Sequence, residues 1–180
     1  WLGRPEPTKG FDLLADAFNS PALAGRNDYR LELHGPLDGA ADTLGAIPGV
    51  HVGTQYRPED LPSLLGSAHV GLTTSRFETF HRVTREYLSA GLAVIAIPAF
   101  GVADVIVDGV NGLVVSPADA AGLARAIVRV LDDRELLNCL RRGATDTEVR
   151  TVDDEIDQLE ELYRTMLRPS DCTSAATLAR

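Results

Sequence analysis

Two glutamates, Glu78 and Glu86, are separated by seven residues. Glu78 follows a short apolar segment, residues 69–75, that is typical of a strand, and Glu86 lies in a segment with helical apolar spacing, residues 83–90. Open α/β sheets bind ligands at the edge where their strands end. An ionised carboxylate accepts two hydroxyl groups at once, so the pair suits a hydroxyl-rich ligand. The alternative is structural, with Glu78 favouring the positive end of the helix and Glu86 lying on its exposed face.

Two cations, Arg4 and Lys9, flank a proline-containing loop near the start of the chain. The segment before this loop, residues 1–4, is typical of the end of a strand, and Thr8 can cap a helix over residues 9–19. A planar guanidinium, a compact ammonium and the amides of a helix N-terminus together suit a diphosphate. The alternative is two solvated charges on a surface loop.

Strands and helices alternate along the chain, with connections short enough to imply right-handed crossovers between parallel strands. The pattern predicts an α/β fold with a Rossmann-like, doubly wound parallel sheet of about six strands. The expected strands are residues 1–4, 29–34, 50–55, 69–75, 93–97 and 113–116. The expected helices are residues 9–19, 38–45, 59–66, 83–90, 102–107, 118–131, 133–142 and 152–167.

The length of 180 residues fits one domain, expected over residues 1–167, followed by a polar tail, residues 168–180, expected to be disordered. The net charge of -9 argues against a nucleic-acid partner, although a single diphosphate needs only a local pair of cations. The longest apolar run, residues 91–98, is far shorter than the roughly 20 residues of a transmembrane helix. Cys139 and Cys172 lack metal-type spacing and are expected to be free thiols, which favours a reducing, cytoplasmic location.

Four motifs together resemble a known family. They are Gly3-Arg4, Lys9-Gly10, the run from Glu78 to Glu86, and the stretch VDGVNGLVV at residues 107–115. In this order and spacing they are similar to the C-terminal half of a retaining GT-B glycosyltransferase of family four. The resemblance covers about residues 1–133 and implies one half of a GT-B fold that binds a nucleotide-sugar donor.

The resemblance also implies roles for individual residues. In this family the matching cations hold the leaving diphosphate, the first glutamate contacts the transferred sugar, and the second contacts the ribose. The catalytic residues would then be Arg4, Lys9 and Glu78. The residues expected at the donor nucleotide are Glu86, the loop residues Phe80, His81, Arg82 and Val83, whose backbone amides would face the phosphates, and Tyr56 and His34, which follow strand ends and would line a base pocket.

The same resemblance defines the expected partners. The donor would be a UDP- or GDP-linked sugar, with no cofactor and no metal ion. The acceptor would bind to an N-terminal domain of a longer parent protein, a hexosyltransferase. The chain of 180 residues alone is therefore expected to bind nucleotide weakly and to be inactive.

The sequence departs from the family pattern at two places. His81 stands where the family usually has glycine, and it would crowd the phosphate, add a cationic contact together with Arg82, or serve the structure alone. Residues 100–104 replace a loop that often carries paired glycines and a glutamate. These departures keep two other interpretations open: half of a GT-B sugar-nucleotide epimerase, and a degenerate module that binds nucleotide or protein without catalysis.

Overall fold

The computed structural model describes residues 1–39, 44–150 and 152–167. The chain divides into two compact units, Trp1–Glu148 and Val149–Arg180, and each is described by itself. The domain boundary expected at residue 167 stays a prediction, and the tail over residues 168–180 lies outside the described residues. No helix in the described part of the chain is long and apolar enough to cross a membrane.

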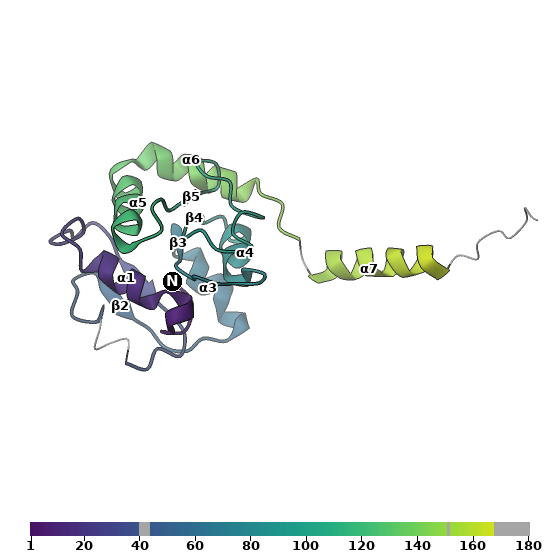
Figure 1. Cartoon of the computed structure of the whole chain (residues 1–180), viewed down its shortest axis with the longest axis horizontal. Helices are drawn as coiled ribbons and strands as arrows, with labels where there is room; N and C mark the ends of the chain where they lie inside the picture. The colour runs from purple at the N-terminus through teal and green to yellow at the C-terminus, as the bar shows by residue number, and fades with distance from the viewer. Residues whose placement is uncertain (40–43, 151, 168–180) are drawn as a thin grey trace, which may run out of the picture. The chain divides into compact units, whose positions relative to one another are not determined.

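Five parallel strands form the centre of the first unit (Figure 1). They are β1 (Leu31–Leu33), β2 (Val50–Val52), β3 (Val70–Thr73), β4 (Ala93–Ala96) and β5 (Gly112–Val114). The first two pair with each other, and the other three form a sheet in the order β3-β4-β5. All residues of β4 are buried, which agrees with their unbroken apolar sequence. The α/β fold with parallel strands is thus confirmed.

The predicted number of about six strands is wrong for the described residues, which contain five. The segment predicted as the first strand, residues 1–4, makes only one isolated parallel bridge, between Leu2 and His34. Two hydrogen bonds flank this bridge: Gly3 N donates to His34 O at 3.0 Å, and His34 N donates to Trp1 O at 3.0 Å. One bridge is too short to form a strand.

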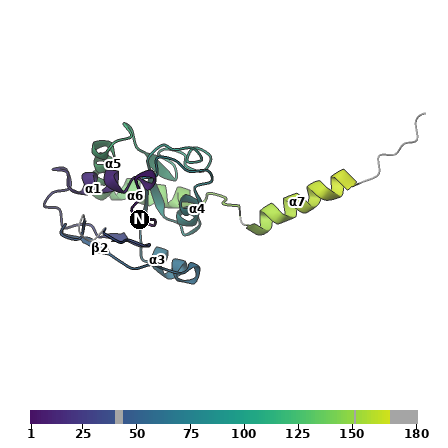
Figure 2. The same cartoon turned by 60° about the horizontal axis from the view of Figure 1, so that its bottom comes forward.

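Helices cover the strands of the first unit. They are α1 (Phe11–Phe18), α3 (Leu61–Gly66), α4 (Arg82–Ser89), α5 (Ala120–Asp132) and α6 (Arg134–Thr145), with short 3-10 helices η1 (Pro7–Lys9) and η2 (Pro58–Asp60). α1 packs against α5, and α4, α5 and α6 all contact β4. Both β2 and α3 lie on the side of this unit away from α5 and α6 (Figure 1 and Figure 2).

Local sequence explains where several helices begin. The Asp119 carboxylate accepts a hydrogen bond from Gly122 N at 2.6 Å at the start of α5, and Asp133 accepts one from Leu136 N at 2.8 Å at the start of α6. The helix predicted over residues 102–107 is wrong, because this segment makes only a single turn before the chain continues to β5. Half of the helix predicted over residues 38–45, namely residues 40–43, lies outside the described residues.

The second unit contains helix α7 (Val152–Leu167). Several of its apolar side chains are exposed, among them Ile156, Leu159, Leu162, Tyr163 and Met166.

Candidate functional site

A cavity of about 400 Å³ lies at the carboxyl end of β3. Its wall is built from three parts of the chain that are far apart in sequence: the first residues, the loop that ends in Lys9, and the segment that runs from β3 into α4. The lining residues are Trp1, Leu2, Gly3, Lys9, Leu72, Thr73, Thr74, Ser75, Glu78, Thr79, Phe80, His81, Arg82 and Val83. Strand ends of an open α/β sheet are the expected place for a ligand.

Gly10 allows the Lys9 loop to lie directly on the end of β3. Its φ is +62°, and a Cβ at this position would lie 2.0 Å from the carbonyl oxygen of Thr74. The buried Thr74 hydroxyl donates to Lys9 O at 2.7 Å and accepts from Trp1 Nε1 at 3.0 Å. The Lys9-Gly10 motif therefore has a structural reason, since only glycine permits this close approach.

Arg76 fixes the same loop from the outside. Its guanidinium donates to Pro7 O at 2.6 Å and to Asp12 Oδ1 at 2.6 Å, and Arg76 N donates to Thr8 O at 2.9 Å. These bonds join the loop to the segment after β3, so Lys9 is held at this edge of the sheet.

Lys9 and Glu78 meet in the wall of the cavity. Lys9 Nζ donates to Glu78 Oε1, and the Ser75 hydroxyl donates to the same oxygen at 3.0 Å. Burial disfavours the charged carboxylate, but the hydrogen bonds from Lys9 and Ser75 outweigh it and lower the pKa of Glu78. Glu78 is therefore an ionised acceptor at neutral pH. The two side chains keep 33% and 23% of their surface exposed, so a ligand can reach both.

His81 occupies the position just before α4 in a left-handed backbone conformation, with a φ of 52°. Glycine adopts this conformation at little cost, whereas residues with a side chain rarely adopt it. The imidazole is buried, with Nδ1 2.8 Å from Thr84 Oγ1, and Nε2 has no partner among the described residues. Burial lowers the pKa of His81, so the ring is neutral at pH 7 and supplies no cation. This favours the structural alternative for its side chain.

The first turn of α4 contributes to the wall through Arg82 and Val83. The first backbone amides of a helix lack partners within the helix, and this helix has no side-chain cap. The positive end of the helix dipole thus lies at the cavity, where it favours an anion. Phe80, which also lines the cavity, carries the Arg85 guanidinium 4.2 Å from its ring centroid.

Glu86 lies one turn further along α4 and outside the cavity lining. Its Oε1 is 3.2 Å from Arg82 Nε, whereas its buried Oε2 has no partner among the described residues. Burial raises the pKa of Glu86, although the positive charge of Arg82 acts to lower it. Burial raises the pKa of Tyr56, and the charge of Glu86 adds to this effect.

Two other predicted residues do not join the cavity. The Arg4 side chain is 66% exposed and lies 3.8 Å from Glu6, although the adjacent Gly3 is part of the wall. His34 lines a second, larger cavity instead, with its Nε2 3.3 Å from Glu32 Oε2. The structure therefore brings together Lys9, Glu78, Phe80, His81, Arg82 and Val83, but not Arg4, His34, Tyr56 and Glu86.

Sequence reasoning missed Ser75 and Thr74, which position the pair of charged side chains. The spacing of Ser75 three residues before Glu78, at the end of a strand, was the available sign. Nothing in the pattern indicated the role of Thr74. Within the described residues, no group of three or more His, Cys, Asp or Glu side chains could hold a metal ion.

Two further segments from the sequence analysis, residues 107–115 and 100–104, lie outside the cavity lining. In the stretch at residues 107–115, the buried Asn111 bonds to Val107 N at 2.8 Å and Val105 O at 2.9 Å, which fixes the turn before β5. A Cβ on Gly101, in the divergent loop, would lie 3.5 Å from Thr79 O. The loop over residues 100–104 therefore lies next to the cavity.

The sequence is similar to that of known proteins. A family model described as glycosyl transferases group 1 matches residues 1–133. The D-inositol 3-phosphate glycosyltransferase of Geodermatophilus obscurus is 32% identical over 203 residues, which cover 100% of this chain and 44% of that protein.

Solved structures show the same similarity at the level of the fold. The HepE protein of Anabaena in complex with UDP aligns with a TM-score of 0.72 at 24% identity, over 91% of this chain and 47% of that one. The C-terminal domain of a group 1 glycosyl transferase, LpcC from Francisella tularensis, aligns with a TM-score of 0.69 at 22% identity, over 81% of this chain and 80% of that domain. The chain thus spans about half the length of the full-length relatives that it matches.

Proposed function

This chain belongs to the glycosyl transferases group 1 family and corresponds to the donor-binding half of its fold, and we propose that the 400 Å³ cavity binds the diphosphate and sugar of a nucleotide-sugar donor. The observation that carries the proposal is the contact between Lys9 and Glu78 beside the first turn of α4. It puts a cation, a hydroxyl acceptor and a helix N-terminus in one wall. In the parent protein, the sugar would pass to an acceptor with retention of configuration.

The chemistry of this wall suits departure of a nucleotide diphosphate. Negative charge grows on the diphosphate as the bond to the sugar breaks, and cations fixed nearby stabilise that charge most in the transition state. Lys9 and the positive end of α4 lie at the cavity, and the exposed Arg4 follows directly after Gly3 in its wall. Because these groups supply the positive charge, the step needs no metal ion.

Glu78 and Glu86 would each bind different hydroxyl groups of the donor. Glu78 is ionised and faces the cavity, so it suits the hydroxyls of the transferred sugar. Glu86 has a buried oxygen without a partner among the described residues, which a ribose hydroxyl would satisfy. Tyr56 would line the base pocket, whereas His34 lines a different cavity, so its contact with the base stays a prediction from the sequence.

Calorimetric titration tests the proposal directly. The folded chain is titrated with UDP, GDP and their sugars, in parallel with an Arg125→Met control on the exposed side of α5. We expect saturable binding of at least one nucleotide sugar, equal in the control. No binding at millimolar concentration by folded protein would contradict the proposal. Product analysis of the parent protein separates the competing interpretations, since an epimerase converts the donor without an acceptor and a degenerate module leaves it unchanged.

A further inference from the structure

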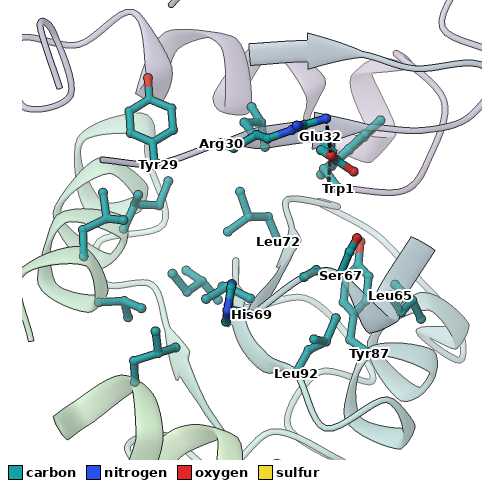
Figure 3. A pocket seen from close by; sticks show the side chains of 18 of the residues that line it. Trp1, Tyr29, Arg30, Glu32, Leu65, Ser67, His69, Leu72, Tyr87 and Leu92 are labelled. Atoms are coloured by element: carbon teal, nitrogen blue, oxygen red, sulfur yellow. Dashed lines mark hydrogen bonds and ion pairs between the residues drawn. The ribbon is translucent and has the colours of Figure 1, made fainter. Parts of the chain in front are cut away.

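Tyr87 ties helix α4 to the first residues of the chain. The residue is 1% exposed, and its hydroxyl oxygen accepts a hydrogen bond from Leu2 N at 2.9 Å. Its side chain also lies in the wall of the second, larger cavity, which measures about 720 Å³ (Figure 3). The two bonded residues are 85 positions apart in the sequence. The bond therefore joins two segments that no local pattern connects.

Gly71 in β3 provides the space for the ring of Tyr87. A Cβ on Gly71 would lie 2.2 Å from Cδ2 of this ring, closer than two nonbonded carbon atoms can approach. A glycine inside a strand weakens the strand, and it often marks a place where another group comes close to the backbone. The ring thus packs directly on the backbone of β3, and this contact fixes where the hydroxyl lies.

The amide of Leu2 is not used by the bridge to β1. That bridge consists of the bonds from Gly3 N to His34 O and from His34 N to Trp1 O, each of 3.0 Å. Successive N–H groups of a paired extended segment point to opposite sides, so Leu2 N faces away from β1. The Tyr87 hydroxyl is its partner on that side. Without this hydroxyl, a buried N–H would lose its hydrogen bond, which folded proteins rarely allow.

Both ends of this bond belong to segments that line the candidate site. Leu2 and Gly3 lie in the wall of the 400 Å³ cavity, and Arg4 follows directly in the sequence. The first turn of α4 lies in the same wall, one turn before Tyr87. The bond thus connects the two parts of the wall to which the positive charge of Arg4 and the helix dipole belong.

We propose that Tyr87 is a positioning residue for the diphosphate, because its bond to Leu2 holds the segment of Gly3 and Arg4 beside the start of α4. This inference rests on the proposed function of the 400 Å³ cavity. Tyr87 lies outside the lining of that cavity, so it acts through Leu2 rather than by touching the donor. Charged groups that are fixed before the reaction stabilise developing charge without first having to reorganise.

A variant that lacks the hydroxyl tests the proposal. Tyr87→Phe keeps the ring in the space beside Gly71, and we expect the Kd for the UDP- or GDP-sugar that binds the native chain to rise about fivefold in calorimetry. The matched control is Tyr29→Phe, which removes a hydroxyl 3.4 Å from Pro48 O, outside the candidate site, and should leave the Kd unchanged. Equal affinities of the native chain and Tyr87→Phe would overturn the inference but leave the proposed function intact. No binding by the native chain would contradict both.

Double variants separate positioning of Arg4 from a general loss of packing. In an Arg4→Met background, Tyr87→Phe should change the Kd by less than about twofold, because the group that it positions has lost its charge. In a Glu86→Gln background, the loss of about fivefold should persist, because the proposed ribose contact does not depend on Leu2. A loss of the same size in both backgrounds would contradict the inference, since Tyr87 would then act on the fold as a whole.

Hydrogen exchange of the full chain tests the bond itself without any ligand. The Leu2 amide should exchange at least about tenfold more slowly than a free peptide amide, and Tyr87→Phe should remove this protection. The Leu31 amide, which donates to Gly49 O at 2.8 Å, should stay protected in both proteins and serves as the internal control. If Tyr87→Phe does not fold, the native chain decides alone, because an unprotected Leu2 amide beside a protected Leu31 amide would overturn the inference.

Discussion

Lys9 donates a hydrogen bond to Oε1 of Glu78, which lies 69 residues further along the chain. The bond joins the cation proposed for the diphosphate to the carboxylate proposed for the sugar. Each side chain therefore satisfies the other when no donor is bound. Donor binding would exchange this ion pair for one contact to phosphate and one to sugar hydroxyls.

Replacing Lys9 should weaken donor binding more than it weakens the fold. Lys9→Met keeps the length of the side chain but removes the charge that faces the cavity. Charged hydrogen bonds are worth roughly 1.5–3 kcal/mol, so we expect the Kd for the nucleotide sugar to rise at least about tenfold. Calorimetry measures this, with Arg125→Met as the control for loss of an exposed charge. Equal affinities of Lys9→Met and the native chain would rule out a role at the phosphate.

Lys9 is also the only lysine in the sequence. Reductive methylation with labelled formaldehyde therefore places a single side-chain probe in the protein. The NMR signal of this probe should shift on titration with a nucleotide diphosphate and stay in place on titration with the free sugar. A signal that shifts with neither ligand would contradict the proposed contact of Lys9 with the diphosphate. This evidence would not depend on calorimetry.

Glu78→Gln should change stability in a pH-dependent way. The pKa of Glu78 is lowered on folding, so its ionised form stabilises the protein above the unfolded pKa of about 4.3, and this contribution is lost as pH falls through the folded value. The variant should be about 1–2 kcal/mol less stable than the native chain at pH 7 and nearly equal to it at pH 3. Urea unfolding at both pH values measures the difference. A difference that does not change with pH would mean that the ion pair is not its source.

The sequence predicted the parts of this site that follow from strand direction. Because the carboxyl ends of parallel strands share one edge, the sequence alone was enough to place Lys9 and Glu78 at the same edge of the sheet. Strand β4 was predictable because its residues are apolar on both faces. The roles of Ser75 and Thr74 were not, because they depend on hydrogen bonds between segments that pattern alone does not bring into register.

The meaning of His81 also lay outside the sequence. The sequence left three roles open: crowding of the phosphate, a cationic contact to it together with Arg82, and a structural role. The structure favours the last, because the residue is held by its backbone conformation and by Thr84. The strand count failed for a related reason: residues 1–4 have strand character, yet only Leu2 forms a bridge. Local preference identifies such a segment, whereas its pairing is decided by neighbours elsewhere in the fold.

Two substitutions at His81 should separate backbone strain from side-chain packing. Both His81→Gly and His81→Ala lose the bond to Thr84, but only glycine adopts a φ of 52° freely. His81→Gly should therefore be about 1 kcal/mol more stable than His81→Ala, as measured by urea unfolding. Thr84→Val serves as the control that removes the hydrogen bond alone. If alanine were tolerated as well as glycine, the left-handed backbone conformation would not be a source of strain at this position.

Glu86→Gln should stabilise the chain while it weakens nucleotide binding. Burial raises the pKa of Glu86, so its charged form opposes folding above the unfolded pKa of about 4.3, and a neutral amide removes that cost. We expect the variant to be equal to the native chain or more stable by up to about 1 kcal/mol at pH 7, with no gain at pH 3. The Kd for the nucleotide should rise, because the partnerless Oε2 is the acceptor proposed for the ribose. Ionised Glu86 would then lower the stability of the chain, whereas ionised Glu78 is expected to raise it.

The matched control for this variant is Glu59→Gln, which neutralises an exposed glutamate in η2 and should change neither property. UDP and its 2′-deoxy analogue, titrated into native and Glu86→Gln protein, identify the group that Glu86 contacts. The native chain should bind UDP more tightly than the analogue, and the variant should bind the two equally, because the ribose hydroxyl has lost its acceptor. If the variant kept the full preference, Glu86 would not contact the ribose, and its raised pKa would be a consequence of burial without a role in binding.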